Sequence, residues 1–153
     1  MMRELIGYMV TWTTYATWLQ GDERGYVKKG EILPGDGKLK EICQKLQKQP
    51  AVTLREGERT IVRKAILTES EKIGQSIRAL AVCTNHIHLV ADPCRESIEQ
   101  IVSRYKNAAM FALCRLGRKG RIWTRGFDKR FCFSQDELVR KIEYVRKHSE
   151  RTG

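Results

Sequence analysis

Apolar and polar residues follow two periods along the chain, and each period predicts one kind of element. Residues 8–14 are rich in β-branched and aromatic side chains, which predicts a strand. The short apolar runs 77–82 and 86–91 predict two more strands, which pair as a hairpin or continue one another. Residues 122–123 and 130–133 are strand-like on either side of a turn at Gly126.

Two stretches have the spacing of amphipathic helices. The clearest begins after Ser97, a good N-cap, and ends at Gly117 and Gly120. Its apolar residues follow an i, i+3, i+4, i+7 pattern: Ile98, Ile101, Val102, Tyr105, Ala109, Ala112, Leu113 and Leu116. The last helix begins at Ser134, with Glu137 at the reciprocal capping-box position. Its apolar stripe consists of Leu138, Ile142 and Val145.

The remaining segments give weaker signals. Residues 18–26 have turn chemistry, 28–37 look irregular, and 39–49 have helical spacing that Pro50 terminates. We expect a short strand around 59–67, and then a helix that opens at 69–71, with Thr68 or Ser70 as its cap, and runs to about Ser76.

This order of elements predicts an α+β fold, with a ferredoxin-like antiparallel sheet and helices packed on one face. No internal repeat or low-complexity linker interrupts the chain, so we expect residues 1–153 to form a single domain. The long apolar strands of a buried parallel sheet are missing from the sequence.

Composition adds a strong positive charge to this fold. The chain has 29 Lys and Arg against 18 Asp and Glu, a net charge of +11, spread from Arg3 to Arg151. A distributed positive field favours a polyanionic partner, nucleic acid first, although a solvated basic surface without a specific partner also fits. The five scattered cysteines include no Cys-x-x-Cys pair, which argues against a zinc knuckle or a disulfide framework. With no signal peptide and no apolar run of transmembrane length, we expect a soluble cytoplasmic protein without membrane contact.

Candidate chemistry centres on His86-Ile87-His88, in the run 85–89. Residues i and i+2 of a strand point to the same face, so both imidazoles project together while Ile87 points away. Such a pair fits one metal ion, but it also fits the polar face of a half-buried sheet. A metal site therefore needs a third ligand from elsewhere in the chain.

The last helix offers that ligand and a nucleophile. Tyr144 and His148 are i, i+4 neighbours on a face away from the apolar stripe, with Lys141 near the same face. An alternative is a tyrosine that packs its ring at the edge of the core, and a histidine favoured near a helix C-terminus. Taken together, His86, His88 and His148 would hold a divalent metal that polarises a phosphodiester. Tyr144, whose phenolate Lys141 would favour, would then attack phosphorus and become linked to DNA.

These residues resemble the HUH-type tyrosine transposases, the group that includes the single-strand insertion-sequence transposases and the REP-associated tyrosine transposases. The metal pair of that family is His-hydrophobic-His on a central strand, here residues 86–88, and its tyrosine lies on a later helix, here 144–148. The segment from Ile122 to Arg130 is similar to the Trp-x-x-x-Phe region of the family, and residues 12–22 resemble the first strand and loop of the REP-associated branch. Residues 26–66 match poorly, and His148-Ser149 stands where that branch often has Asn-Pro.

The resemblance implies a ferredoxin-like core, Mg²⁺ or Mn²⁺ as the metal, and a homodimer. It implies cleavage and rejoining of single-stranded DNA through a 5′-phosphotyrosine, with the DNA recognised as a hairpin near the end of a mobile or repeated element. The residue four after the tyrosine commonly supplies the third ligand, which gives His148 that role. Whether the tyrosine serves its own chain or a partner stays open at this stage. Basic residues of the second half of the chain are the candidate DNA contacts: Arg104, Lys106, Arg118, Lys119, Arg121, Arg125, Arg130, Arg140 and Lys147.

Three other classes of protein share part of this pattern. A histidine-triad nucleotide hydrolase needs a third histidine where this chain has Val90. A structural zinc domain needs clustered cysteines, and Cys83 lies an odd step from both histidines, so it should face away on a regular strand. A catalytically inactive, domesticated DNA-binding relative would keep the basic surface without needing His86, His88, Tyr144 and His148 together, and it remains the alternative.

Overall fold

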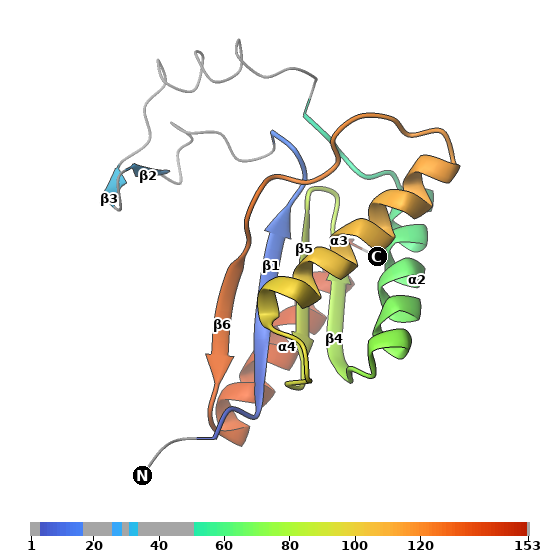
Figure 1. The fold of residues 1–153 in the computed structure, drawn as a ribbon. Helices are drawn as coiled ribbons and strands as arrows, with labels where there is room; N and C mark the ends of the chain where they lie inside the picture. Colours follow the sequence, from blue (N-terminus) through green and yellow to red (C-terminus); the bar gives the residue numbers. More distant parts are fainter. Residues whose placement is uncertain (1–3, 17–25, 29–30, 34–50, 153) are drawn as a thin grey trace.

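The computed structural model describes residues 4–16, 26–28, 31–33 and 51–152, and its centre is a four-stranded antiparallel sheet. The strands lie in the order β4 (Ile77–Val82), β5 (His86–Ala91), β1 (Gly7–Thr13) and β6 (Asp128–Cys132). Figure 1 shows β1 and β5 at the middle of this sheet, with β6 and β4 at its edges. The two central strands therefore hold any side chain they carry on a framework that is hydrogen-bonded on both sides.

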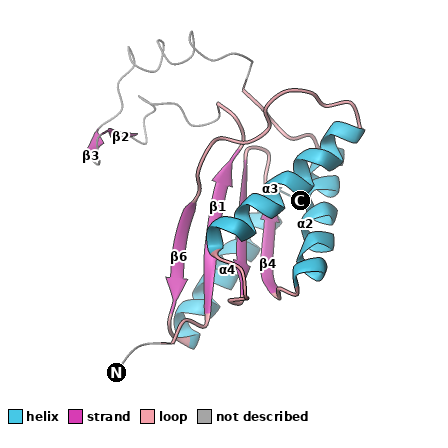
Figure 2. Cartoon of the chain, viewed as in Figure 1, coloured by secondary structure: helices cyan, strands magenta, loops and turns pink. Residues whose placement is uncertain are grey.

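Among the described residues, three helices pack on this sheet, and they divide between its faces. In chain order the core is β1, α2 (Glu56–Ile73), β4, β5, α3 (Ile98–Arg115) and β6, which is the ferredoxin-like βαββαβ plan. The α+β class and the antiparallel sheet are thus confirmed. The helices α2 and α3 share one face, as expected, whereas α4 (Gln135–Thr152) covers the opposite face (Figures 1 and 2).

Alternation along the strands explains why both faces are covered. Tyr8, Val10 and Trp12 of β1 pack in the larger core with α2 and α3. Met9, between them, belongs to a second cluster with Leu138 and Val145 of α4 and with apolar residues of β4 and β5. Each face of the central strands is therefore apolar enough to bury a helix.

The helix α4 docks through the stripe that its sequence predicted. Leu138 and Val145 are buried and Ile142 is partly buried against the same cluster. Close approach depends on Gly7, because a Cβ at that position would lie 2.8 Å from Cδ1 of Leu138. At the start of the helix, Ser134 Oγ accepts a hydrogen bond of 3.2 Å from the backbone nitrogen of Glu137, which confirms the cap.

Most of the strongly patterned segments are confirmed. The structure has strands where β1, β4, β5 and β6 were expected, although Trp123 forms only an isolated bridge with Thr14. For α3, the capping box joins Ser97 and Gln100, and Gly117 follows the helix with a left-handed φ of 96°.

The weakly patterned segments contain the errors. The expected strand at 59–67 is wrong, because these residues belong to α2, and so is a helix opening at 69–71. β-Branched residues such as Ile61 and Val62 favour a strand locally, but Val62, Ile66 and Ser70 recur every four residues and are buried. The helix instead begins after Arg55 and ends at Gly74, in a left-handed conformation with φ 70°.

A separate hairpin corrects the expectation of irregular structure at 28–37. It is made of β2 (Tyr26–Lys28) and β3 (Glu31–Leu33). The predicted helix at 39–49 and the loop at 18–25 lie outside the described residues. Within the described part of the chain, none of the helices has the length and hydrophobicity to cross a membrane.

Candidate metal and nucleophile site

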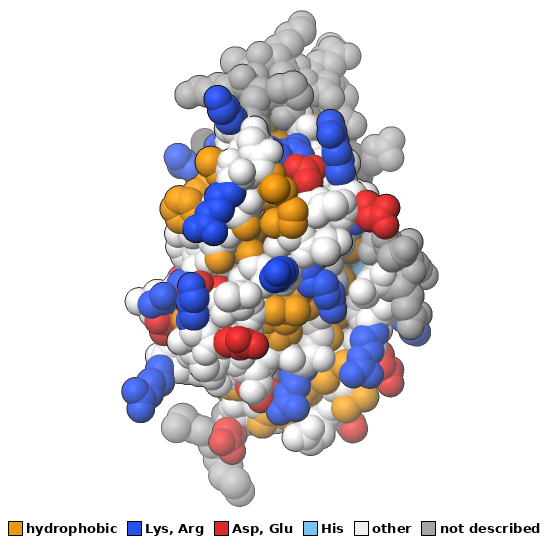
Figure 3. All heavy atoms as spheres, turned by 90° about the vertical axis from the view of Figure 1, so that its right-hand side faces the viewer, with side chains coloured by type: hydrophobic (Ala, Val, Ile, Leu, Met, Phe, Trp, Pro, Cys, Tyr) orange, Lys and Arg blue, Asp and Glu red, His pale blue; other side chains and the backbone are white. Residues whose placement is uncertain are grey.

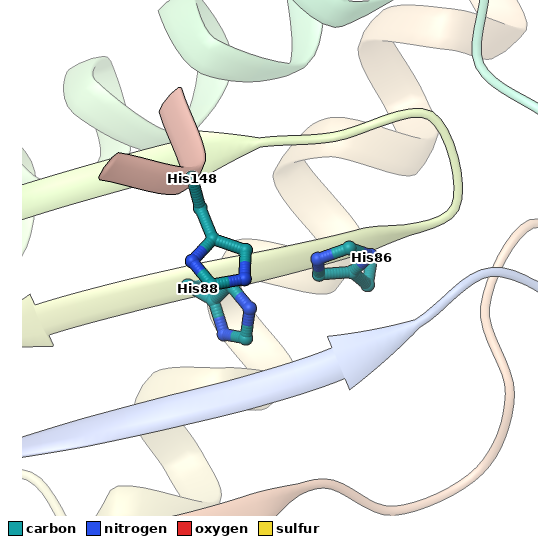
Figure 4. Close-up of side chains that lie close together, drawn as sticks. All are labelled: His86, His88 and His148. Atoms are coloured by element: carbon teal, nitrogen blue, oxygen red, sulfur yellow. The ribbon is translucent and has the colours of Figure 1, made fainter. Parts of the chain in front are cut away.

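Three histidines converge between the sheet and α4. His86 and His88 project from β5 on the face that α4 covers, while Ile87 is buried in the core on the other face. His148 reaches them from α4, and Figure 4 shows the three rings turned toward one another. One ligand atom from each residue lies within 4.8 Å of the other two. Among the described residues this is the one cluster of three or more potential metal ligands.

Each of the three rings is oriented through its Nδ1 atom. His86 Nδ1 lies 2.7 Å from Asn85 Oδ1, and His148 Nδ1 lies 3.0 Å from the backbone oxygen of Tyr144. Both oxygens can only accept, so Nδ1–H donates in each case and the lone pair resides on Nε2. His88 Nδ1 is paired with Thr11 Oγ1 at 2.8 Å, and Thr11 is the residue opposite His88 in the β1–β5 register. Such contacts fix the tautomer and the orientation of a metal-binding histidine.

Burial and charge determine the protonation of His88. Its ring is buried, and this desolvation, together with the nearby His86 and His148, lowers its pKa to about 4. His88 is therefore neutral at neutral pH, and the neutral imidazole is the form that binds metals.

The donor set fits a divalent metal ion. The three rings are held through their Nδ1 atoms, so each can offer its other nitrogen to a metal. Three nitrogen ligands leave further coordination positions for water or substrate, as in catalytic metal sites. Imidazole ligands suit transition metals better than Mg²⁺, which prefers oxygen. Cys83 was expected to face away from the histidines, and this is wrong: it packs in the α4-side cluster, because the hairpin turn interrupts the strand alternation. Its thiol is buried and lies outside the histidine cluster.

Tyr144 lies beside the histidines in the same chain. Its ring centroid is 4.3 Å from that of His148 and 5.4 Å from that of His88. The side chain is 46% exposed, so substrate can reach it. A pocket of about 300 Å³ opens here, lined by Met9, Thr11, His88, Asp128, Arg130, Lys141 and Tyr144. The structure thus brings Lys141 and Tyr144 together with His148, as their helical spacing predicted, and places all three beside His88.

The candidate DNA contacts are divided between different environments. Arg130 borders this pocket, and Arg140 borders a neighbouring pocket that Arg130 and the candidate catalytic Lys141 also line. Four other candidates do not line this pocket and instead form contacts within the fold. Arg104 pairs with Glu96, and Arg118 pairs with Glu58. Lys106 donates to the backbone carbonyls of Thr124 and Gly126, and Arg121 donates to that of Trp123. Lys119, Arg125 and Lys147 are exposed. Figure 3 shows basic side chains dispersed over the face beside α2, so charge alone does not mark a binding surface.

Two residues of the site were not among those predicted from the sequence. Thr11 orients His88 across two strands, and Asp128 lines the pocket from β6. Both lie on the α4 face in register with His88, because Thr11 pairs with His88 on one side and with Asp128 on the other. The positions of Thr11 and Asp128 beside His88 follow from the strand register, which cannot be read from the sequence.

Comparison with known proteins gives structural matches only. No protein-family model and no curated protein matches the chain. Among solved structures, the chain matches a REP-associated tyrosine transposase bound to a REP hairpin, with a TM-score of 0.60 and 13% identity, over 100% of this chain and 72% of that one. A Deinococcus radiodurans protein named as a candidate transposase matches over 96% of this chain and 93% of its own, with a TM-score of 0.45 and 15% identity.

The first match shows that the chain has the fold of a REP-associated tyrosine transposase. This agrees with the fold that the sequence resemblance implied. The second match carries no further argument. At these identities a shared fold does not establish the chemistry, which has to be argued from the site itself.

Proposed function

We propose that the protein is a metal-dependent single-stranded DNA endonuclease and transposase of the HUH tyrosine type. The observation that carries this proposal is the position of Tyr144, next to His88 and His148 and in one pocket with Lys141. A nucleophile, a cation and a candidate metal cluster lie together there, and no residue of a second chain is needed to complete the set. The fold shared with a REP-associated tyrosine transposase supports the same class.

The residues divide the chemistry among them. The metal held by His86, His88 and His148 would supply positive charge against the phosphodiester oxygens. Lys141 lines the same pocket and adds positive charge there, and the phenolic proton passes to water, which reaches the half-exposed ring of Tyr144. Tyr144 Oη then forms a bond to phosphorus as the bond from phosphorus to the 3′ oxygen breaks, and that oxygen takes a proton from water.

The products are a 5′-phosphotyrosine and a free 3′ hydroxyl. One phosphodiester has replaced another, so the bond energy is kept and a 3′ hydroxyl can attack the phosphotyrosine in the reverse sense. This reversibility accounts for rejoining as well as cleavage. Mg²⁺ or Mn²⁺ is the proposed metal, a DNA hairpin with single-stranded flanks is the proposed substrate, and a homodimer is the proposed assembly.

Covalent capture of DNA tests the proposal. A pool of labelled hairpins with randomised single-stranded flanks is incubated with the full chain and Mn²⁺ or Mg²⁺, and adducts that survive denaturing electrophoresis are measured. We expect a metal-dependent adduct that Tyr144→Phe abolishes while hairpin binding is retained. Tyr15→Phe is the matched control, because Tyr15 lies under Arg121, outside the pocket.

The competing function is a DNA-binding module without catalysis, which the net charge of +11 favours. It predicts hairpin binding by the unaltered chain with no adduct under either metal. An adduct of undiminished yield in Tyr144→Phe would instead assign the nucleophile to another residue and refute the proposed role of Tyr144.

A further inference from the structure

Two partly exposed phenylalanines lie at the open edge of the sheet. Among the described strands, β6 lies at the edge of the sheet and pairs with β1 alone. Phe131 on this strand is 42% exposed and Phe133, just after it, is 38% exposed. Their ring centroids are 6.2 Å apart with an angle of 41° between the planes. Single exposed apolar residues are ordinary, but an adjacent aromatic pair on a sheet edge offers ring faces to a planar ligand.

A second pocket connects this edge to the nucleophile. It has a volume of about 210 Å³ and is lined by Arg130, Phe131, Glu137, Arg140 and Lys141. Arg130 and Lys141 also line the pocket of Tyr144 and His88, so the two pockets share a border. Phe131 is opposite Tyr8 in the β1–β6 register, so its side chain lies on the α2/α3 face, whereas Arg130, opposite Met9, lies on the α4 face with Tyr144. A chain molecule bound at Tyr144 would therefore pass Arg130 and Lys141 and bend around the edge strand β6 to reach Phe131.

The charge along this path is positive. Arg130, Arg140 and Lys141 line it, against Glu137 and, at the Tyr144 end, Asp128. Asp128 pairs with Arg130 at 3.2 Å, whereas Arg140 and Lys141 form no ion pair among the described residues. Next to the rings, Lys129 Nζ lies 5.8 Å from the Phe131 centroid and is paired with Glu99. Basic side chains that follow an aromatic pair match a polymer of alternating phosphates and flat bases.

We propose that Phe131 and Phe133 form a stacking platform for the bases of the single strand that continues from the phosphodiester at Tyr144. The proposal rests on the proposed function for its choice of strand. The ligand is single-stranded, because bases stacked inside a duplex have no face to offer an aromatic ring. Stacking is tolerant of base identity, so the platform holds the strand in the site and leaves sequence recognition to other contacts.

Binding of two oligomers with the same phosphates but different bases tests this platform. A fluorescein-labelled oligothymidylate and an abasic oligomer of equal length are titrated with the full, metal-free chain, and binding is followed by fluorescence anisotropy. The variants are Phe131→Leu, Phe133→Leu and the double variant, since leucine keeps the apolar packing but removes the ring. Phe111→Leu is the control, because Phe111 is 61% exposed on α3, away from both pockets.

We expect each leucine variant to bind oligothymidylate about fivefold or more weakly than the unaltered chain. On the abasic oligomer the variants and the unaltered chain should bind equally, and Phe111→Leu should change neither affinity. Phe131→Trp should keep the affinity for oligothymidylate that Phe131→Leu loses, because tryptophan retains an aromatic ring. Unchanged binding of oligothymidylate overturns the proposal, and so does an equal loss on both oligomers, because that loss would come from charge or packing.

The outcomes separate this platform from the nicking chemistry, because the titration contains no metal. An adduct at Tyr144 together with unaltered binding by the leucine variants refutes the platform and leaves the proposed function standing. If the chain forms no adduct but the leucine variants lose affinity for oligothymidylate alone, the platform is supported and the protein binds single strands without cutting them.

Discussion

His148 Nδ1 donates a hydrogen bond of 3.0 Å to the backbone oxygen of Tyr144, one turn earlier in α4. This bond directs the lone pair of His148 toward His86 and His88. It also attaches the third candidate ligand to the residue that carries the nucleophile, so any shift of α4 moves both together. Since Leu138 and Val145 anchor the same helix to the sheet, packing of the α4 face sets the geometry of the site.

Removal of His148 should weaken metal binding without unfolding the chain. His148→Ala deletes one of three nitrogen ligands from a partly exposed position, so we expect metal affinity to fall by about tenfold or more. Titration with Co²⁺, followed by its visible absorption, measures this. Lys147→Ala, one position earlier and exposed, should leave the titration unchanged; equal effects of the two substitutions would show that His148 is not a ligand.

Thr11 should act on the metal through His88. Thr11→Val keeps the shape of the side chain but removes the oxygen that lies 2.8 Å from His88 Nδ1, and we expect a loss of about 10- to 100-fold in metal affinity. Thr11→Ser should restore most of it, because serine supplies the same hydroxyl. A loss of stability without a loss of affinity, measured by urea unfolding and the same titration, would assign Thr11 a purely structural role.

The set of metals that bind should follow the chemistry of the three imidazoles. With no carboxylate or thiolate in the cluster, affinity should rise from Mn²⁺ through Co²⁺ to Ni²⁺ and exceed that for Mg²⁺ throughout. Calorimetric titration of the chelator-treated chain with each ion measures the series. If Mg²⁺ binds as tightly as Co²⁺, the ligands include oxygen donors outside the three histidines, and Asp128 in the adjoining pocket is then the first candidate.

Local patterns predicted most of this site, because its parts lie on elements with clear periods. The two-residue spacing of His86 and His88 and the four-residue spacing of Tyr144 and His148 each place a pair on one face without knowledge of the fold. The contact between the two pairs required the resemblance to a known family as well. The sequence could not predict which face of the sheet α4 covers, because the apolar stripe of a helix is the same whichever face of the sheet it packs against.

Contacts that depend on register or on distant segments escaped prediction for a similar reason. Thr11 meets His88 only through the alignment of β1 with β5. For α2, the β-branched residues near its start favoured a strand, and burial against α3 and the sheet overrode that preference. Arg118 was a reasonable DNA contact by charge, but it binds Glu58, which lies 60 residues earlier.

Arg118 should therefore matter for stability more than for DNA binding. Its Nη1 lies 2.6 Å from both carboxylate oxygens of Glu58, and it also donates to the Thr53 carbonyl at 3.2 Å. Arg118→Ala leaves a partly buried carboxylate without its partner, and we expect a loss of about 1–3 kcal/mol in the free energy of unfolding.

The salt dependence of binding to single-stranded DNA should be unchanged in this variant. Arg140→Ala should reduce the slope by about 0.7 for its one lost phosphate contact.

The pH dependence of stability gives a second test of the same ion pair. Burial by itself would raise the pKa of Glu58, but the hydrogen bonds from Arg118 and the Arg55 backbone outweigh it and lower the pKa. The unfolded chain therefore binds the proton more readily, so the pair stabilises the fold above the unfolded pKa and loses this contribution as the pH falls through the folded one. In Arg118→Ala the free energy of unfolding should therefore fall less between neutral and acidic pH than in the unaltered chain, as measured by urea unfolding at a series of pH values. Lys119→Ala is the control. If Arg118→Ala loses as much stability at acidic pH as the unaltered chain, Arg118 does not hold the Glu58 carboxylate in its charged form.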